Sequence, residues 1–152
     1  MILLCGIPTE TPLDLVRSAL DSSGAEYLLF NQRHFAETHL EFEVADGQVT
    51  GVLEMDGQRL CLESVTGVYT RLMDDQALPE VSDLPPGAPQ RVHCRALHDA
   101  LNQWLEIAPA RVVNRSVPMG SNSSKPYQAQ LIARCGFAVP ETLITNDPEQ
   151  VE

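Results

Sequence analysis

Residues 1–30 read MILLCGIPTE TPLDLVRSAL DSSGAEYLLF, and they predict two strands joined by a helix. Ile2 to Cys5 form a continuous apolar run closed by Gly6, a pattern typical of a parallel strand that is covered on both faces. Glu26 to Phe30 form a second such run. About 30 residues is the usual length of a β-α-β unit. The N-terminus therefore indicates an α/β domain built on a parallel sheet.

The segment between these runs has the signals of a helix. Thr11 is a candidate N-cap, Pro12 suits the first helical position, and Asp14 favours the positive end of the helix dipole. Gly24 is a candidate stop. Three apolar residues recur at helical spacing: Leu13, Val16 and Leu20.

From Leu40 to Leu62 the apolar spacing changes to a period of two. Phe42 and Val44, then Val52 or Leu53, then Leu60 and Leu62 fit one face of such strands. The pattern is broken by Asp-Gly at residues 46–47 and 56–57, a strong hairpin signal. An antiparallel meander, inserted into the parallel sheet or flanking it, is expected here.

Residues 65–115 alternate again between strand and helix patterns. Val65 to Tyr69 and Arg111 to Arg115 predict strands, and Gln90 to Ile107 predicts a long helix with an apolar stripe. Leu78 to Pro89 contains four prolines and is expected to be an irregular loop, long enough to be functional or mobile. The fold class is therefore α/β, with a Rossmann-like, mostly parallel sheet, flanking helices and a β-meander.

The C-terminal stretch contains the single lysine of the chain, Lys125. A helix is expected to begin beside it, with a cap among residues 122–124, Pro126 in the first turn and Gly136 at the end. Thr142 to Thr145 predicts a strand. Residues 147–149 predict the start of another helix, so the chain is expected to stop within an unfinished domain.

Composition restricts the function classes. Ten Lys and Arg face 21 Asp and Glu, giving a formal net charge of -11, which repels nucleic acid and anionic membranes. The chain has neither a membrane-spanning run nor a signal-peptide core, so a cytoplasmic location is expected. The four cysteines are widely spaced among apolar residues and are expected to be buried, reduced thiols. Cys94 and His98 share a helix face, but two ligands do not make a metal site.

Candidate ligand residues follow the strands. Ligands of open α/β sheets bind outside the carboxyl ends of the strands, where the sequence places Arg71 and Asn114-Arg115. A guanidinium fork suits a carboxylate or phosphate, although pairing with one of the many acids is the alternative. Dinucleotide, Walker A, nucleophile-elbow and zinc-protease motifs are absent from the sequence, so no complete catalytic motif is assigned.

The segment from Val112 to Glu149 resembles the start of the nucleotide-binding part of ATP-grasp ligases. Within that superfamily the chain is most similar to the ribosomal-protein glutamate ligase type (RimK-like) and to ligases that modify ribosomally made peptides. Tyr69-Thr70-Arg71 and Val113-Asn114 fit this resemblance. Ser124 departs from it, because an acid commonly precedes the lysine in the family. The further matching positions are Lys125, Gln128, Leu131, Gly136, Phe137, Val139, Pro140, Thr142 and Asp147-Pro148-Glu149.

The resemblance implies a pre-ATP-grasp domain over residues 1–115, followed by a linker and an incomplete ATP-grasp domain over residues 116–152. Lys125 would bind the ATP phosphates, and Arg71, Asn114 and Arg115 would be candidate substrate contacts. A solvated surface lysine is the alternative for Lys125. The implied reaction forms an acyl phosphate that an amine or another nucleophile attacks.

The implied partners are a peptide or small carboxylate substrate and a C-terminal ATP-grasp domain, with ATP and magnesium bound by the full-length protein. Residues 1–152 alone are expected to be non-catalytic and to bind nucleotide weakly. A homodimer is a candidate assembly. The alternative functions are a non-catalytic peptide-binding or adaptor module and a small α/β ligand-binding domain unrelated to ligases.

Overall fold

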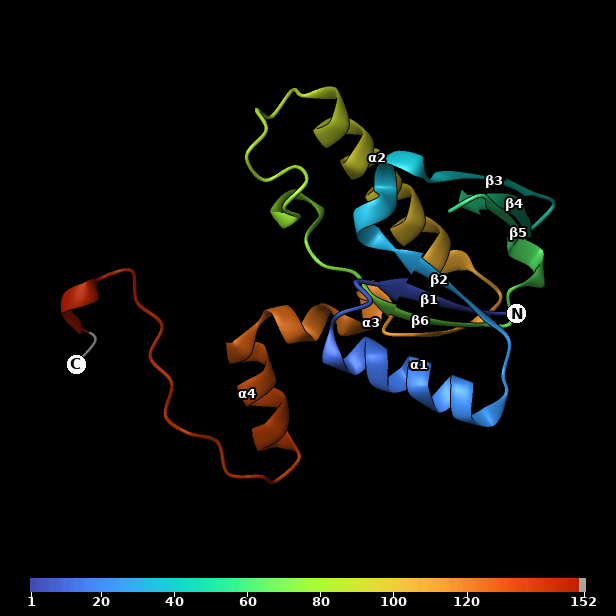
Figure 1. Cartoon of the computed structure of the whole chain (residues 1–152). Helices are drawn as coiled ribbons and strands as arrows, with labels where there is room; N and C mark the ends of the chain where they lie inside the picture. The colour runs from blue at the N-terminus through green and yellow to red at the C-terminus, as the bar shows by residue number, and fades with distance from the viewer. Residues whose placement is uncertain (151–152) are drawn as a thin grey trace. The chain divides into compact units, whose positions relative to one another are not determined.

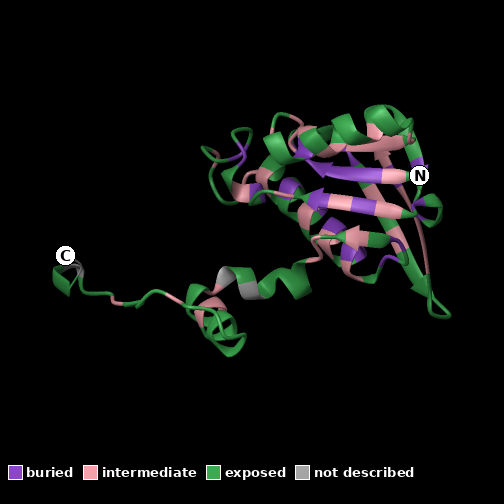
Figure 2. Cartoon of the chain, turned by 90° about the horizontal axis from the view of Figure 1, so that it is seen from below, coloured by how far each residue is buried: buried purple, intermediate pink, exposed green. Residues whose placement is uncertain are grey.

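The computed structural model describes residues 1–150, except for the side chains of Ser121, Ser123 and Pro148. The chain forms two compact units, Met1–Ser116 and Val117–Glu152 (Figure 1). Buried residues gather on the strands of the first unit (Figure 2). Within the described residues, no helix combines the length and the apolar character needed to cross a membrane.

A four-stranded parallel sheet lies at the centre of the first unit. Its strands are β1 (Ile2–Gly6), β2 (Tyr27–Asn31), β6 (Gly67–Arg71) and β7 (Arg111–Val113), in the order β2-β1-β6-β7. Helix α1 (Thr11–Ser23) connects β1 to β2, and α2 (Pro89–Ile107) runs between β6 and β7. The two helices cover opposite faces of the sheet (Figure 1). The predicted α/β class and parallel sheet are confirmed.

Helix α1 begins one residue earlier than the sequence suggested. Its N-cap is Glu10, which makes no side-chain capping bond, and Thr11 is already helical. The prediction of Thr11 as the cap was wrong, because Pro12 lacks an N–H and fits either of the first two helical positions. The predicted stop is confirmed: Gly24 adopts a left-handed conformation with φ 68°.

The meander forms a separate antiparallel sheet that flanks the parallel one. It consists of β3 (His39–Ala45), β4 (Gln48–Met55) and β5 (Gln58–Cys61), in the order β3-β4-β5. Both predicted turns are confirmed. Asp46 and Gly47 have φ values of 52° and 76°, and Asp56 and Gly57 have 49° and 74°. Positive φ at both central residues is the requirement of a type I′ turn, which suits the twist of a hairpin.

The core of this unit is formed by one face of α2, the parallel sheet and the inner face of the meander. Trp104 and Leu53 are fully buried, as are Leu78 and Val81 from the long loop. The buried residues of α2 confirm the predicted stripe: Cys94, Leu97, Leu101, Trp104 and Leu105.

Of the loop predicted over Leu78 to Pro89, residues 78–88 are irregular as predicted, whereas Pro89 already begins α2. The irregular residues are anchored to the rest of the unit. Besides the two buried side chains of this loop, Arg91 of α2 donates from Nη1 to the carbonyl of Leu84 at 2.7 Å and to those of Val81 and Ser82 at 3.4 Å. One guanidinium thus ties three loop carbonyls to the helix.

The described part of the second unit contains helix α4 (Lys125–Arg134). Helix α3 (Ser116–Met119), which the sequence had not suggested, begins at the last residue of the first unit and continues into the second. Ser124 caps α4 by accepting from the Tyr127 N–H at 3.4 Å, and Gly136 follows with φ 81°, as predicted. No residue between 117 and 150 whose burial is described is buried.

The predicted strand at Thr142 to Thr145 is wrong. These residues are irregular and pair with no strand in the part of the chain that is described, and a strand needs a partner for its backbone groups. The predicted helix start at residues 147–149 is a single 3₁₀ turn in this structure. The 3₁₀ helices are η1 (Gln32–Glu37), η2 (Leu62–Ser64), η3 (Asp75–Ala77), η4 (Gly120–Ser123) and η5 (Pro148–Gln150).

The four cysteines are free thiols that differ in exposure. Cys5 and Cys94 are buried as predicted, whereas Cys61 and Cys135 are exposed, which corrects the prediction for those two. Cys61 lies on an edge strand, and Cys135 follows a helix without buried residues. Burial raises the pKa of the Cys5 thiol. It also raises that of Cys94 to about 11, with a smaller contribution from the charge of Asp75.

We expect a thiol-specific disulfide reagent at pH 8 to modify only Cys61 and Cys135 rapidly in the native chain. Cys5 and Cys94 should react only on unfolding, because they are inaccessible and raised pKa values keep them protonated. Peptide mapping by mass spectrometry would locate the label. The double variant Cys61→Ser/Cys135→Ser should lose the rapid phase, and rapid native labelling of Cys5 would contradict the burial.

Candidate functional site

The carboxyl edge of the parallel sheet contains a topological switch point. From β1 the chain moves outward to β2, and from β6 it moves outward in the opposite direction to β7. The strand order therefore reverses between β1 and β6, where ligands of open α/β sheets bind. Gly6 and Arg71 are the last paired residues of these two strands and lie opposite each other.

Gly6 allows the two strand ends to approach closely. Its φ is 152°, and a Cβ at this position would lie 2.9 Å from the Arg71 carbonyl oxygen. A side chain would therefore meet main chain, which cannot easily move away. Glycine at this position keeps the backbone of the switch point compact.

Arg71 directs its guanidinium to an acid at the start of α1. Its Nε lies 3.2 Å from Oε2 of Glu10, and the two side chains are 42% and 26% exposed. In residues 1–150, no acceptor is in hydrogen-bonding contact with Nη1 or Nη2 of Arg71. The structure thus shows the acid pairing that the sequence left open, and it also leaves donors of the fork available at the switch point.

Asn114 connects the ends of two strands. It adopts a left-handed conformation with φ 73°, which asparagine tolerates better than most residues. Its Nδ2 donates to the carbonyl of Thr70 at 3.1 Å. This bond joins the end of β7 to that of β6, next to Arg71.

Arg115 binds main-chain carbonyls near the end of α2. Its Nη1 donates to the carbonyls of Leu105 and Glu106, the latter at 2.6 Å. Its Nη2 donates to those of Ala108 and Ala110 at 2.8 and 3.1 Å. Both terminal nitrogens are therefore engaged with the protein, a geometry that favours a structural role. Its contact with a substrate remains a prediction.

Lys125 is the first residue of α4 and is exposed. Its Nζ donates to Oε1 of Gln128 at 3.2 Å, and Gln128 in turn donates from Nε2 to Asn122 at 2.8 Å. Lys125 belongs to the second unit, whereas Arg71, Asn114 and Arg115 belong to the first. Among the predicted residues, the structure brings only Arg71 and Asn114 together at one strand edge.

Two residues of this edge were missed by the sequence reasoning. Glu10 is the partner of Arg71, and Gln32 is a buried amide directly after β2. Gln32 donates to the carbonyl of Met73 and accepts from the Met73 N–H, both at 2.8 Å, which fastens the end of β2 to the segment after β6. Its position directly after an apolar strand was the available signal, as it was for Asn114.

The side chains in the described part of the chain form no group of three or more His, Cys, Asp or Glu suited to a metal. Of the Cys94 and His98 pair, the Cys94 thiol lies 3.8 Å from the Asp75 carbonyl oxygen. The Nδ1 atom of His98 is buried and has no described partner. We assign no metal ligand to residues 1–150.

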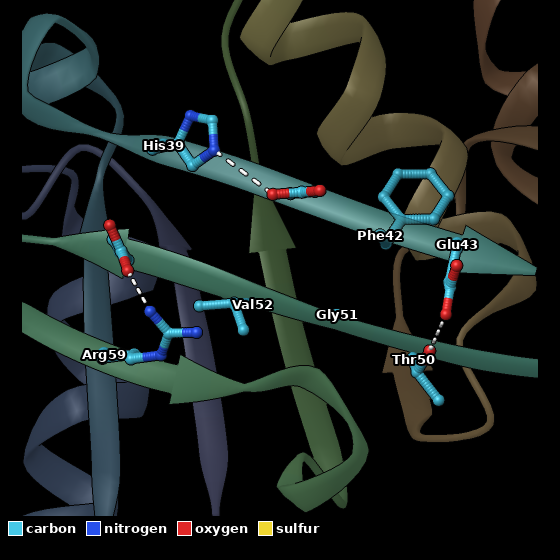
Figure 3. Close-up of a pocket in the computed structure, with 9 residues that line it drawn as sticks. His39, Phe42, Glu43, Thr50, Gly51, Val52 and Arg59 are labelled. Carbon is cyan, nitrogen blue, oxygen red and sulfur yellow. Dashed lines mark hydrogen bonds and ion pairs between the residues drawn. The ribbon is translucent and has the colours of Figure 1, made fainter.

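A separate groove of about 220 Å³ lies on the meander, and Figure 3 shows its lining. Glu54 and Arg59 form an ion pair at 2.6 Å, His39 lies 3.8 Å from Glu41, and Thr50 donates to Glu43 at 3.4 Å. The other lining residues are Phe42, Gly51 and Val52.

Comparison with solved structures shows the fold. The chain is similar to the macrocyclase MdnC from Microcystis aeruginosa, solved with precursor peptide MdnA (21% identity, TM-score 0.73, covering 99% of this chain and 47% of that one). It is also similar to a Chryseobacterium gregarium RiPP-associated ATP-grasp ligase, solved with ADP and a leader and core peptide (23% identity, TM-score 0.73, covering 98% of this chain and 45% of that one).

A third similar structure is the ATP-grasp ligase PsnB with precursor peptide PsnA2 and AMPPNP (25% identity, TM-score 0.61, covering 99% of this chain and 48% of that one). No family model and no curated protein matches the chain. The chain spans about half the length of these solved structures. The predicted resemblance to ATP-grasp ligases is confirmed as a resemblance of fold.

Proposed function

We propose that residues 1–152 form the N-terminal, substrate-side part of an ATP-dependent carboxylate-amine ligase that modifies a peptide or protein. The observation that supports this most is the match of nearly the whole chain to part of two ATP-grasp ligases and a macrocyclase, each solved with a peptide. We assign residues 1–115 to the pre-ATP-grasp domain and residues 116–152 to a linker and the start of the ATP-grasp domain. The unit boundary at Ser116 supports this division.

In the proposed reaction a substrate carboxylate is phosphorylated by ATP, and ADP leaves. An amine then attacks the acyl phosphate, and inorganic phosphate leaves as the amide bond forms. The unused Nη donors of Arg71 suit a carboxylate or an acyl phosphate at the switch point. Asn114 would position this edge through its bond to Thr70. Magnesium would accompany ATP in the full-length protein.

Lys125 is proposed to bind the ATP phosphates. It is an exposed point charge whose only described bond is to the neutral amide of Gln128, so no acid has to be displaced. In the full-length protein, Lys125→Ala is expected to weaken ATP binding about 10- to 150-fold, the equivalent of a charged hydrogen bond of about 1.5 to 3 kcal/mol. Calorimetric titration would measure this.

Arg134→Ala is the matched control, because it removes an exposed cation from the other end of α4. It should leave ATP affinity within about twofold, because an exposed charge that does not touch the phosphates is largely screened. Equal affinities for the wild type and Lys125→Ala would refute the phosphate role. A full-length protein that forms no ADP with any peptide would refute the ligase proposal itself.

A non-catalytic peptide-binding module is the second candidate. The peptides solved with the similar structures support it, because such a module would need only the peptide contact. Under either proposal residues 1–152 alone should bind ATP no more tightly than millimolar, and micromolar binding would contradict this assignment.

A further inference from the structure

The outer face of the meander is a sheet face that no other element of the unit Met1–Ser116 covers (Figure 1). The inner face carries Leu53, Met55 and Leu60, which are buried. The intervening residues point the other way, as side chains of a strand do, and Glu41 and Arg59 among them are exposed. The groove shown in Figure 3 runs across this outer face.

The groove is net negative when its histidine is neutral. Three carboxylates line it, from Glu41, Glu43 and Glu54, and the single arginine, Arg59, is already paired with Glu54. Within the part of the chain that the structure describes, Glu43 has only the Thr50 hydroxyl as a partner. Glu41 faces His39, which is charged only when protonated. Two carboxylates therefore lie on a strand edge without a permanent cation.

The surface is also elongated. A second depression of about 280 Å³ shares Glu54 and Arg59 with the groove and adds Glu37 and residues of the β4-β5 turn. The groove itself contains lining residues from all three strands, which are spaced about 4.8 Å apart in a sheet. Because the groove and the second depression together follow β4 from Thr50 to Met55, their combined length suits an extended chain better than a compact small molecule.

We propose that this face docks an extended, basic peptide segment. Lysine or arginine side chains would pair with Glu41 and Glu43, and small apolar side chains would contact Val52. A second copy of this chain is a poor occupant, because each copy carries a formal net charge of -11. The proposal is independent of the ligase function, since it uses neither Lys125 nor the switch point.

The test is fluorescence anisotropy with the 152-residue chain and a labelled peptide of alternating lysine and valine, about eight residues long. The double variant Glu41→Gln/Glu43→Gln should weaken binding about five- to tenfold, as expected for the loss of two exposed charge pairs. Amide NMR shifts on adding the peptide should concentrate in β3 and β4. A matched peptide with glutamate in place of lysine should not bind.

Glu26→Gln/Asp99→Asn is the matched control, because it removes the same charge from exposed positions outside the groove. It should change the dissociation constant less than about twofold. Equal weakening by both double variants would show attraction to the overall charge alone and overturn the proposal. Wild-type binding no tighter than millimolar, or NMR shifts outside the meander only, would overturn it as well.

Discussion

Arg115→Ala is expected to lower the free energy of unfolding by about 3 kcal/mol, because a charged side chain that donates to four main-chain carbonyls is removed. Those carbonyls cluster at and just after the end of α2, and three of them belong to the buried residues Leu105, Ala108 and Ala110. Chemical denaturation followed by the fluorescence of the single tryptophan, the fully buried Trp104, would measure the loss.

Electrostatics also favours the Arg115 guanidinium at the C-terminal end of α2. Helix α2 has no basic residue in its last turn, where the negative end of the helix dipole and the free carbonyls favour a cation. Ala108 and Pro109 end the helix, and the chain returns through β7 to place Arg115 at this end. The Arg115 guanidinium, from a residue outside the helix, supplies the positive charge that the last turn of α2 lacks.

Arg111→Ala is the matched control, since Arg111 is an exposed arginine on β7 whose side chain makes no described hydrogen bond or ion pair. It should change stability by less than about 0.5 kcal/mol. If Arg115→Ala leaves stability unchanged but impairs substrate binding in the full-length protein, Arg115 is a substrate residue and its capping role is refuted.

Arg115 also shows why part of the site could not be read from the sequence. A cation directly after a predicted strand suits a ligand role, and the same rule correctly placed Arg71 at the switch point. Which acceptors each guanidinium reaches depends on tertiary contacts: Glu10 is 61 residues from Arg71, and Thr70 is 44 residues from Asn114. The residue types at the edge were predictable, but their partners were not.

The fold was predictable where local chemistry determines it. The Asp-Gly turns require positive φ, and both hairpins formed where these pairs occur. The strand predicted at Thr142 to Thr145 failed because an apolar run becomes a strand only beside a partner. The face assignment of β4 was left open between Val52 and Leu53, because Gly51 interrupts the alternation. Leu53 is the buried one.

Gly51 is the second position where a large effect is expected. It lies opposite Phe42 in the β3-β4 ladder. A Cβ there would collide with the main-chain oxygen of Glu41 and would lie 2.7 Å from Cα and Cβ of Phe42. Because these atoms belong to the backbone or adjoin it, no rotamer change relieves the overlap. We expect Gly51→Ala to lower the free energy of unfolding by about 3 kcal/mol, measured by the same denaturation experiment.

Gly67→Ala separates this overlap from the general effect of alanine in a strand. Gly67 begins β6, and a Cβ there would have Ile2 Cγ1 as its nearest neighbour at 3.8 Å, an ordinary contact. Alanine also narrows the conformations of the unfolded chain, so Gly67→Ala should be neutral or stabilising by up to about 1 kcal/mol. If both variants lowered the free energy of unfolding by similar amounts, strand glycines in general would be sensitive to substitution by alanine. The close approach of β3 and β4 would then not be the cause. A loss of stability confined to Gly51→Ala would make Gly51 the residue that permits the close approach of β3 and β4.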